Sequence, residues 1–165
     1  MSSHVARSVL QQCIGAKLMV KPASETSAAE YVHIKTGVVI FVCFMKGATA
    51  EILPKMVKSL CEVKLSPCSE TKKRLSILDL PGDILVIPQA TLGGKMKGKA
   101  IQYHENIDKE LGKELYYNFV KLVEETFEAN KSKTPNECTM QHGTYGNLQV
   151  LSMDTNGPYT HVVEF

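Results

Sequence analysis

Apolar residues in this chain gather in short runs of strand length, separated by polar turn residues. Residues 5–20 predict two strands that meet near Gly15, and residues 32–44 predict more strand, with a turn at Gly37. The run 84–87 is apolar and bounded by Pro81-Gly82 in front and Pro88 behind. This pattern is typical of a strand buried on both faces.

Two further stretches have apolar residues at helical spacing. Thr49 is a candidate cap for the first helix, in which Pro54 lies early enough to be tolerated. Asp108 is a candidate cap for the second, which we expect to run to about Ala129. The apolar positions are Ile52, Leu53, Met56, Val57 and Leu60 in the first helix, and Leu111, Leu115, Phe119, Leu122 and Val123 in the second.

The remaining segments complete an α+β pattern. Residues 21–30 and 66–73 are polar and predict loops, whereas 75–80, 148–154 and 159–165 alternate as strands do. Strands without strict βαβ alternation favour an α+β fold, with mainly antiparallel strands forming sheets or a partial barrel and two main helices. A length of 165 residues suits one domain over residues 1–165.

Composition argues against several environments. The net charge is only +2 at pH 7, so no strong global field draws the chain to nucleic acid or membrane. Five cysteines without a CxxC pair, and no leader-like start, indicate reduced thiols and a cytoplasmic location. The longest apolar run, 38–45, is too short to span a bilayer.

Three motifs of known chemistry are incomplete. Residues 93–99 fit G-x-x-x-x-G-K, but Ala100 stands where a P-loop needs Ser or Thr for magnesium. Cys138 and His142 are four residues apart, yet two ligands do not make a zinc site. No G-x-S-x-G elbow is present. We therefore expect no nucleotide hydrolysis, no metal and no cofactor.

Small polar groups follow the buried strand at 84–87. Gln89, Ala90 and Thr91 come directly after it, and Gly93-Gly94 follow. A rigid strand that delivers such groups to a glycine-rich mouth is a common way to present a site, although a plain strand end and loop has the same pattern. Asn156-Gly157-Pro158, taken alone, predicts a turn between two terminal strands.

Three segments taken together resemble the signatures of the D-aminoacyl-tRNA deacylase family. They are 9–12 (VLQQ), 82–92 (GDILVIPQATL) and 156–160 (NGPYT). They are similar to that family's VVQR, its strand ending in SQFTL, and its NxGPxT. Their order, their spacing, the long helix between them and the total length agree with the family over essentially the whole chain.

The departures from these signatures resemble the divergent animal branch of the family. Pro88 and Ala90 stand where the family has Ser and Phe, and Gln12 stands where it has Arg. The resemblance implies a homodimer in which the Gly-Pro dipeptide of one subunit enters the active site of the other. It implies hydrolysis of the ester between an amino acid and the terminal adenosine of tRNA. Substrates in that branch include L-alanine on tRNA(Thr), D-amino acids and glycine.

The resemblance also implies roles for individual residues. Ala90 would donate its N–H to the developing oxyanion, Gln89 would orient the ester and Thr91 would position substrate, with the RNA's own terminal 2′-hydroxyl contributing to catalysis. Gly157-Pro158 would filter chirality, with its peptide cis in the main family and trans in the animal branch. Supporting residues are Gln12, Asn156 and Thr160. We hypothesise that Gln12, in place of Arg, determines which isomer Pro158 adopts.

The segment with Lys95, Lys97 and Lys99 predicts a basic loop. In a tRNA enzyme it is the best candidate for phosphate contact. An alternative function is a non-catalytic RNA-binding or adaptor protein on the same fold, because Pro88 and Ala90 depart from the family's site.

Overall fold

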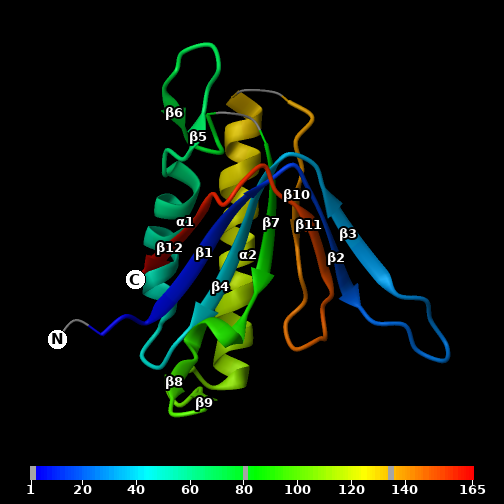
Figure 1. Cartoon of the computed structure of the whole chain (residues 1–165), viewed down its shortest axis with the longest axis vertical. Helices are drawn as coiled ribbons and strands as arrows, with labels where there is room; N and C mark the ends of the chain where they lie inside the picture. Colours follow the sequence, from blue (N-terminus) through cyan, green and yellow to red (C-terminus); the bar gives the residue numbers. More distant parts are fainter. Residues whose placement is uncertain (1–2, 80–81, 134–135) are drawn as a thin grey trace.

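The computed structural model describes residues 3–79, 82–133 and 136–165. Its centre is a five-stranded sheet in the order β10-β7-β4-β1-β12 (Figure 1). Strands β4, β7 and β10 run parallel to one another, and β1 is antiparallel to both β4 and β12. The bounds are β1 Ala6–Cys13, β4 Gly37–Phe44, β7 Asp83–Pro88, β10 Met140–His142 and β12 Thr160–Glu164.

A second, antiparallel sheet covers one face of the central sheet. It has the order β11-β2-β3, with β2 at Gly15–Lys21, β3 at Glu30–Ile34 and β11 at Leu151–Asp154. Leu18 of this sheet belongs to one buried cluster with Val39 and Leu85 of the central sheet. Two small hairpins complete the strands: β5 Ser66–Pro67 with β6 Arg74–Leu75, and β8 Lys95–Lys97 with β9 Ala100–Gln102.

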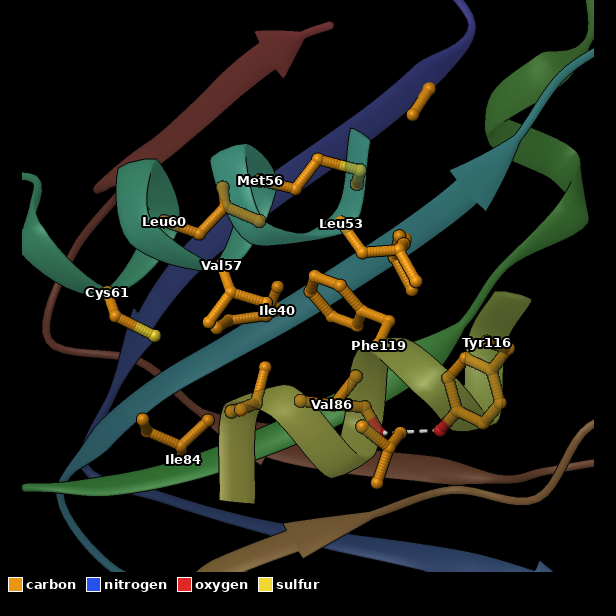
Figure 2. Close-up of a cluster of buried hydrophobic side chains, with 14 of the residues drawn as sticks. Ile40, Leu53, Met56, Val57, Leu60, Cys61, Ile84, Val86, Tyr116 and Phe119 are labelled. Carbon is orange, nitrogen blue, oxygen red and sulfur yellow. Dashed lines mark hydrogen bonds between the residues drawn. The ribbon is translucent and has the colours of Figure 1, made fainter. Parts of the chain in front are cut away.

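Two helices cover the other face (Figure 1). A 3-10 turn, η1 at Ala50–Ile52, leads into α1 at Leu53–Glu62, and α2 spans Lys109–Lys133. Phe119 of α2 lies between α1 and the sheet, fully buried, with its ring 6.4 Å from that of Phe44 (Figure 2). A short 3-10 turn, η2 at Ala90–Gly93, follows β7 directly.

The parallel pair β4 and β7 depends on a glycine at its start. Gly37 is opposite Asp83, and a Cβ at position 37 would lie 1.9 Å from the Asp83 carbonyl oxygen. The Asp83 carboxylate in turn accepts the backbone N–H groups of Lys35 at 2.7 Å and Thr139 at 2.8 Å. The start of β7 is thereby tied to both neighbouring chain segments.

The predicted α+β fold is confirmed, and so is the buried strand at 84–87. As expected, one strand ends and the next begins at Gly15 (β1 and β2) and at Gly37 (β3 and β4). Asp108 caps α2 through its carboxylate, which accepts the N–H groups of Glu110 and Leu111. No helix within the described residues has the length and apolar character needed to cross a bilayer.

Two expectations about helices were wrong. Thr49 makes no side-chain capping bond, because η1 precedes α1 and places Ile52 at its N-cap instead. Leu111 is 54% exposed, because the face of α2 that packs on the sheet does not include position 111. That face consists of Gly112, Leu115, Tyr116, Phe119, Val120, Val123 and Phe127.

Three expectations about strands also need correction. The strand expected at 75–80 is confined to β6, because the Ser76 hydroxyl bonds to Asp79 and closes a turn; Leu80 lies outside the described residues. The loop expected at 66–73 begins with β5. Residues 155–159 are not a hairpin turn, since β11 pairs with β2 and β12 pairs with β1, so this segment crosses between the two sheets.

Candidate active site

A cavity of about 430 Å³ opens where β4 and β7 end. The carboxyl ends of parallel strands are a frequent place for ligand sites in sheets of this kind. Its walls come from these strand ends, η2, the segment before α2, the start of α2, and the loop that follows β10. The lining residues are Val42, Cys43, Phe44, Pro88, Gln89, Ala90, Asn106, Ile107, Lys109, Tyr116, Tyr145, Gly146, Asn147 and Gln149.

Strand β7 brings Gln89 and Ala90 to the cavity wall. The Gln89 N–H donates to Val42 at 2.9 Å, and the chain then turns into η2. Leu92 donates back to the Gln89 carbonyl at 3.2 Å as the first bond of that turn. Ala90 is the first residue of η2 and lines the cavity. Because the first N–H groups of a helical turn have no partner inside it, we expect the Ala90 N–H to be free to donate to a ligand there.

Asn106 fixes the η2 turn from the opposite side, a role that the sequence did not reveal. Its side-chain Nδ2 donates to the Ala90 carbonyl at 2.8 Å. Its Oδ1 is buried without a hydrogen-bond partner among the described residues, close to Gly93. A Cβ at Gly93 would lie 1.7 Å from that oxygen. The Asn106 side chain therefore fits against the backbone of Gly93 only because position 93 has no Cβ, and its hydrogen bond to the Ala90 carbonyl holds Ala90 in place.

Thr91 is exposed and does not line the cavity. Its hydroxyl accepts a hydrogen bond from the Gln89 amide at 3.0 Å. In this position Thr91 orients Gln89, and the amide oxygen of Gln89 stays available as an acceptor.

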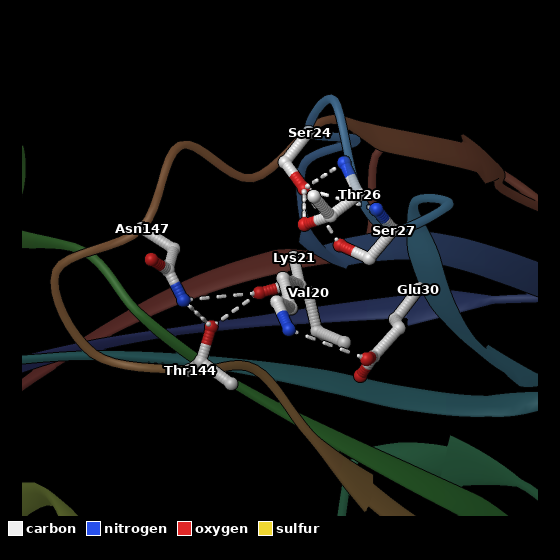
Figure 3. Close-up of polar contacts among 8 residues, drawn as sticks. All are labelled: Val20, Lys21, Ser24, Thr26, Ser27, Glu30, Thr144 and Asn147. Carbon is white, nitrogen blue, oxygen red and sulfur yellow. Dashed lines mark hydrogen bonds and ion pairs between the residues drawn. The ribbon is translucent and has the colours of Figure 1, made fainter.

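The loop at 143–149 forms the far wall, and no sequence motif identified it. The Thr144 hydroxyl and the Asn147 amide both donate to the carbonyl of Val20 in β2, the latter at 3.3 Å (Figure 3). Gln149 accepts the Thr144 N–H at 2.8 Å. These bonds join the cavity wall to the second sheet.

Burial raises the pKa of three ionisable groups that line the cavity, Cys43, Tyr116 and Tyr145, and so keeps them neutral. Desolvation raises the pKa of the Cys43 thiol, whose sulfur lies 3.7 Å from the Ala90 carbonyl. Desolvation also raises the pKa of Tyr116, whose hydroxyl donates to the Gly143 carbonyl at 2.7 Å. Lys109 is the charged residue among those lining the described cavity. The cavity thus offers hydrogen-bond donors and acceptors and one cation.

The turn containing Asn156, Gly157 and Pro158 lies at the other end of the central sheet (Figure 1). The Gly157 carbonyl accepts the Tyr159 N–H at 2.8 Å and, more weakly, the Gln11 amide at 3.4 Å. The Thr160 hydroxyl donates to the Gln11 side-chain oxygen. Every peptide bond among the described residues is trans, including that before Pro158.

Gln11, which the sequence did not single out, is therefore the side chain in contact with this turn. The neighbouring Gln12 side chain donates instead to the Leu65 carbonyl at 3.3 Å, on the helix-covered face. Within the part of the chain that the structure describes, the contact of Gln12 with this turn is its backbone N–H, which donates to the Tyr159 carbonyl at 3.2 Å.

The predicted site residues thus form two separate groups in one chain. Gln11 pairs with Val39 of β4, whereas the cavity begins at Val42. Three residues of strand separate them by roughly 10 Å. Gln89 and Ala90 lie at the cavity, and Gly157 and Pro158 do not line the cavity of their own chain.

The lysine-rich segment after η2 is a hairpin, β8 and β9, rather than the expected loop. Lys95 forms an ion pair with Glu105 at 2.8 Å, and this contact holds the pKa of the Glu105 carboxyl below its usual value. Lys97 and Lys99 are exposed and have no ion-pair partner in the described part of the chain.

The described residues contain no group of three or more His, Cys, Asp or Glu side chains placed to hold a metal ion. His142 lies 4.0 Å from Glu124 and its other ring nitrogen 2.9 Å from the Gly143 carbonyl.

Comparison with known proteins gives a consistent result. Residues 9–164 match the family model described as D-Tyr-tRNA(Tyr) deacylase. The chain is 55% identical over 160 residues to D-aminoacyl-tRNA deacylase 2 of Homo sapiens, covering 97% of this chain and 95% of that protein. It is 53% identical to the Danio rerio protein of the same name, covering 97% and 99%. A solved structure of a probable eukaryotic D-amino acid tRNA deacylase superposes with a TM-score of 0.82 at 27% identity, covering 98% of this chain and 100% of that chain.

Proposed function

The chain belongs to the D-Tyr-tRNA(Tyr) deacylase family, and we propose that it is an aminoacyl-tRNA editing hydrolase acting in the cavity at the end of β7. The family resemblance found in the sequence is confirmed over nearly the whole chain. The vertebrate relatives carry the name of an enzyme that removes amino acids from tRNA, which is an ester hydrolysis.

The observation that carries this proposal is that Ala90, the first residue of η2, lines the cavity, where its N–H can donate to a ligand. During hydrolysis a water oxygen bonds to the ester carbonyl carbon, and negative charge develops on the carbonyl oxygen. The bond to the ribose oxygen then breaks, and the ribose oxygen takes up a proton. A fixed N–H donor stabilises the charged intermediate more than the substrate and so lowers the barrier. An aminoacyl ester is already reactive, so such positioning suffices.

Other residues of the site have supporting roles in this mechanism. Thr91 holds the Gln89 amide, which orients the ester through its free oxygen. Asn106 fixes the carbonyl of Ala90 and hence the direction of its N–H. The terminal 2′-hydroxyl of the RNA lies beside the ester and adds the proton-transfer group that the cavity side chains do not supply.

Replacing Ala90 tests the proposal at one atom. Ala90→Pro removes the N–H at the first position of η2, where proline is tolerated because that N–H has no partner inside the turn. We expect kcat to fall about 100- to 1,000-fold with KM nearly unchanged. Ala90→Gly keeps the N–H and is the matched control. Equal activity of the two variants would contradict a role for this N–H.

Selectivity, in this proposal, is supplied by a second subunit. Gln11, whose side chain contacts the Gly157 carbonyl, lies roughly 10 Å along the sheet from the cavity of its own chain. This separation supports insertion of Gly157 and Pro158 into the cavity of a partner in a homodimer. The Gly157 carbonyl accepts hydrogen bonds from Tyr159 and Gln11 of its own chain, which keep it turned toward its own subunit. A carbonyl turned away from the partner's cavity leaves room there beside the substrate's α-carbon. This supports a filter that admits L-alanine as well as glycine and D-amino acids, while rejecting larger L-side chains.

The tRNA body is proposed to contact the β8–β9 hairpin. Lys97 and Lys99, near its tip, have no ion-pair partner within residues 3–79, 82–133 and 136–165, whereas Lys95 is partly neutralised by Glu105. Lys97→Glu with Lys99→Glu should weaken tRNA binding and flatten its salt dependence, while leaving hydrolysis of a minimal aminoacyl-adenosine intact. Lys58→Glu, an exposed lysine on α1, is the control. Equal loss on both substrates would count against this contact.

A further inference from the structure

The β8–β9 hairpin has an apolar face that its own chain leaves uncovered. Met96 is 78% exposed, Ile101 49% and Tyr103 44%. Met96 and Ile101 are directly paired across the two strands. Tyr103 follows β9, and its ring lies beside Ile101, because both side chains come close to Gly94. Three large apolar side chains gathered on one small exposed hairpin indicate a binding surface.

Gly94 holds this face in a fixed arrangement. A Cβ at position 94 would lie 2.5 Å from Ile101 Cγ2 and 2.8 Å from Tyr103 Cε1. Ile101 and the Tyr103 ring therefore rest directly on the backbone of the hairpin. A ring held in this way loses little freedom when a flat group stacks on it.

Charge on the same hairpin points to the chemistry of the partner. Lys95 and Lys97 alternate with Met96, and Lys99 lies at the turn next to Gly98. Lys97 and Lys99 have no ion-pair partner among the described residues. Because side chains alternate along a strand, Lys95 and Lys97 lie on the face opposite Met96, and Lys99 lies at the turn at the end of both faces. A hairpin with an apolar and aromatic face and cations on its other face and at its turn fits flat bases joined by negatively charged phosphates, as in single-stranded nucleic acid.

The position of the hairpin beside the cavity determines which nucleotides of a bound polynucleotide would contact it. Its first strand follows Ala90 through η2, and its second leads to Asn106, and both residues line the cavity. The hairpin therefore starts and ends beside the cavity, and Figure 1 shows β8 and β9 projecting beyond the end of β7. A polynucleotide whose terminal nucleoside occupies the cavity must pass over the rim where the hairpin starts and ends.

We propose that Met96, Ile101 and Tyr103 form a stacking surface for the unpaired bases that precede the terminal adenosine of tRNA. This inference rests on the proposed function. It adds a sequence-tolerant contact to the 3′ single strand, separate from the lysine contacts to phosphates and from the catalytic cavity.

The first test compares two hydrolysis substrates. Tyr103→Ala should raise KM for aminoacyl-tRNA about tenfold, the effect of losing roughly one stacked base, with kcat unchanged. Hydrolysis of aminoacyl-adenosine, which lacks the preceding bases, should not change. Tyr103→Phe should restore the wild-type KM. Tyr31→Ala, at an aromatic residue of similar exposure on β3, is the control.

The second test measures binding without catalysis and so stands if the proposed function fails. Fluorescence anisotropy would compare uncharged tRNA with the same tRNA trimmed of its unpaired 3′ nucleotides. Tyr103→Ala and Met96→Ser should weaken binding of the intact tRNA only, and leave the salt dependence of binding unchanged. Equal weakening of both tRNAs, or no weakening of either, would overturn the proposal. A change from dimer to monomer in these variants would also overturn it, because a second copy of the chain would then cover the face.

Discussion

The backbone N–H of Ala90 depends on contacts from residues far along the chain. Asn106 bonds to the Ala90 carbonyl, and its side chain fits only because Gly93 lacks a Cβ. The sequence indicated Gln89, Ala90 and Thr91 because they follow a strongly apolar strand. It could not indicate Asn106, because the bond between Asn106 and Ala90 forms only when the β8–β9 hairpin folds back.

We predict that Gly93→Ala reduces activity more than stability. The new methyl group would displace the Asn106 side chain and shift η2, so kcat should fall about 10- to 100-fold through misplacement of Ala90. Gly15→Ala is the control, because its nearest contact would be an ordinary 3.7 Å. Steady-state kinetics and thermal melts of both variants measure the two effects. An unchanged kcat would show that the fit of Asn106 against Gly93 does not position Ala90.

The cysteines should differ widely in reactivity. Hydrogen bonds from the Thr71 hydroxyl and from the Thr71 and Glu70 N–H groups hold the pKa of Cys68 below its ordinary value of 9.0. Burial raises the pKa of Cys61 to about 12. Because the thiolate is the reactive form, we expect iodoacetamide to modify Cys68 first, with a rate that reaches half its maximum below pH 9.

Peptide mapping after limited labelling measures this order, and Cys68→Ser should remove the fast phase. Modification of native Cys61 at the rate of Cys68 would show that burial and hydrogen bonding do not set the reactivity of these thiols.

At the scale of elements, β7 is the strand on which the site depends. Its apolar run predicted burial on both faces, and burial is what the two covering layers provide. The strands that pair with β7 could not be predicted, because parallel neighbours such as β4 are far apart in the sequence and their pairing leaves no local sequence pattern. Residues 155–159 show the same limit: Asn-Gly favours a hairpin locally, yet β11 and β12 belong to different sheets.

The close approach of β4 and β7 leads to a stability prediction. Gly37→Ala would place a methyl group against the Asp83 carbonyl, a backbone atom that cannot move without separating the strands. We expect the free energy of unfolding to fall by about 1–3 kcal/mol. Urea denaturation measures this, with Gly15→Ala as the control. If Gly37→Ala lowered the free energy of unfolding no more than Gly15→Ala, β4 and β7 could separate at this point without destabilising the protein.

At the scale of the whole molecule, the cavity residues and the Gly157-Pro158 turn lie apart within one chain, and we propose that they meet when two chains combine. The three motifs were visible in the sequence, but their placement at opposite ends of one sheet was not, because it follows from the strand order. The proposed homodimer brings the Gly157-Pro158 turn of one chain to the cavity of the other.

A purified heterodimer tests this arrangement. One subunit carries Ala90→Pro and an intact turn; the other carries Gly157→Ala with Pro158→Ala and an intact cavity. The homodimer of the turn variant should hydrolyse L-threonyl-tRNA(Thr) because its filter is damaged. In the heterodimer the only active cavity receives an intact turn, so this hydrolysis should disappear while L-alanyl-tRNA(Thr) is still cleaved. Persistent cleavage of L-threonyl-tRNA(Thr) would place the filter within one chain.

Deacylation assays on three purified substrates would show whether the protein is an editing enzyme with an open chiral filter. We predict that the wild-type protein hydrolyses L-alanyl-tRNA(Thr) and D-tyrosyl-tRNA and spares L-threonyl-tRNA(Thr). Cleavage of the D-substrate alone would contradict the open filter inferred from the Gly157 carbonyl turned toward its own subunit. Hydrolysis of none of the three, by folded protein that binds tRNA, would contradict the enzyme itself and favour a non-catalytic RNA-binding protein.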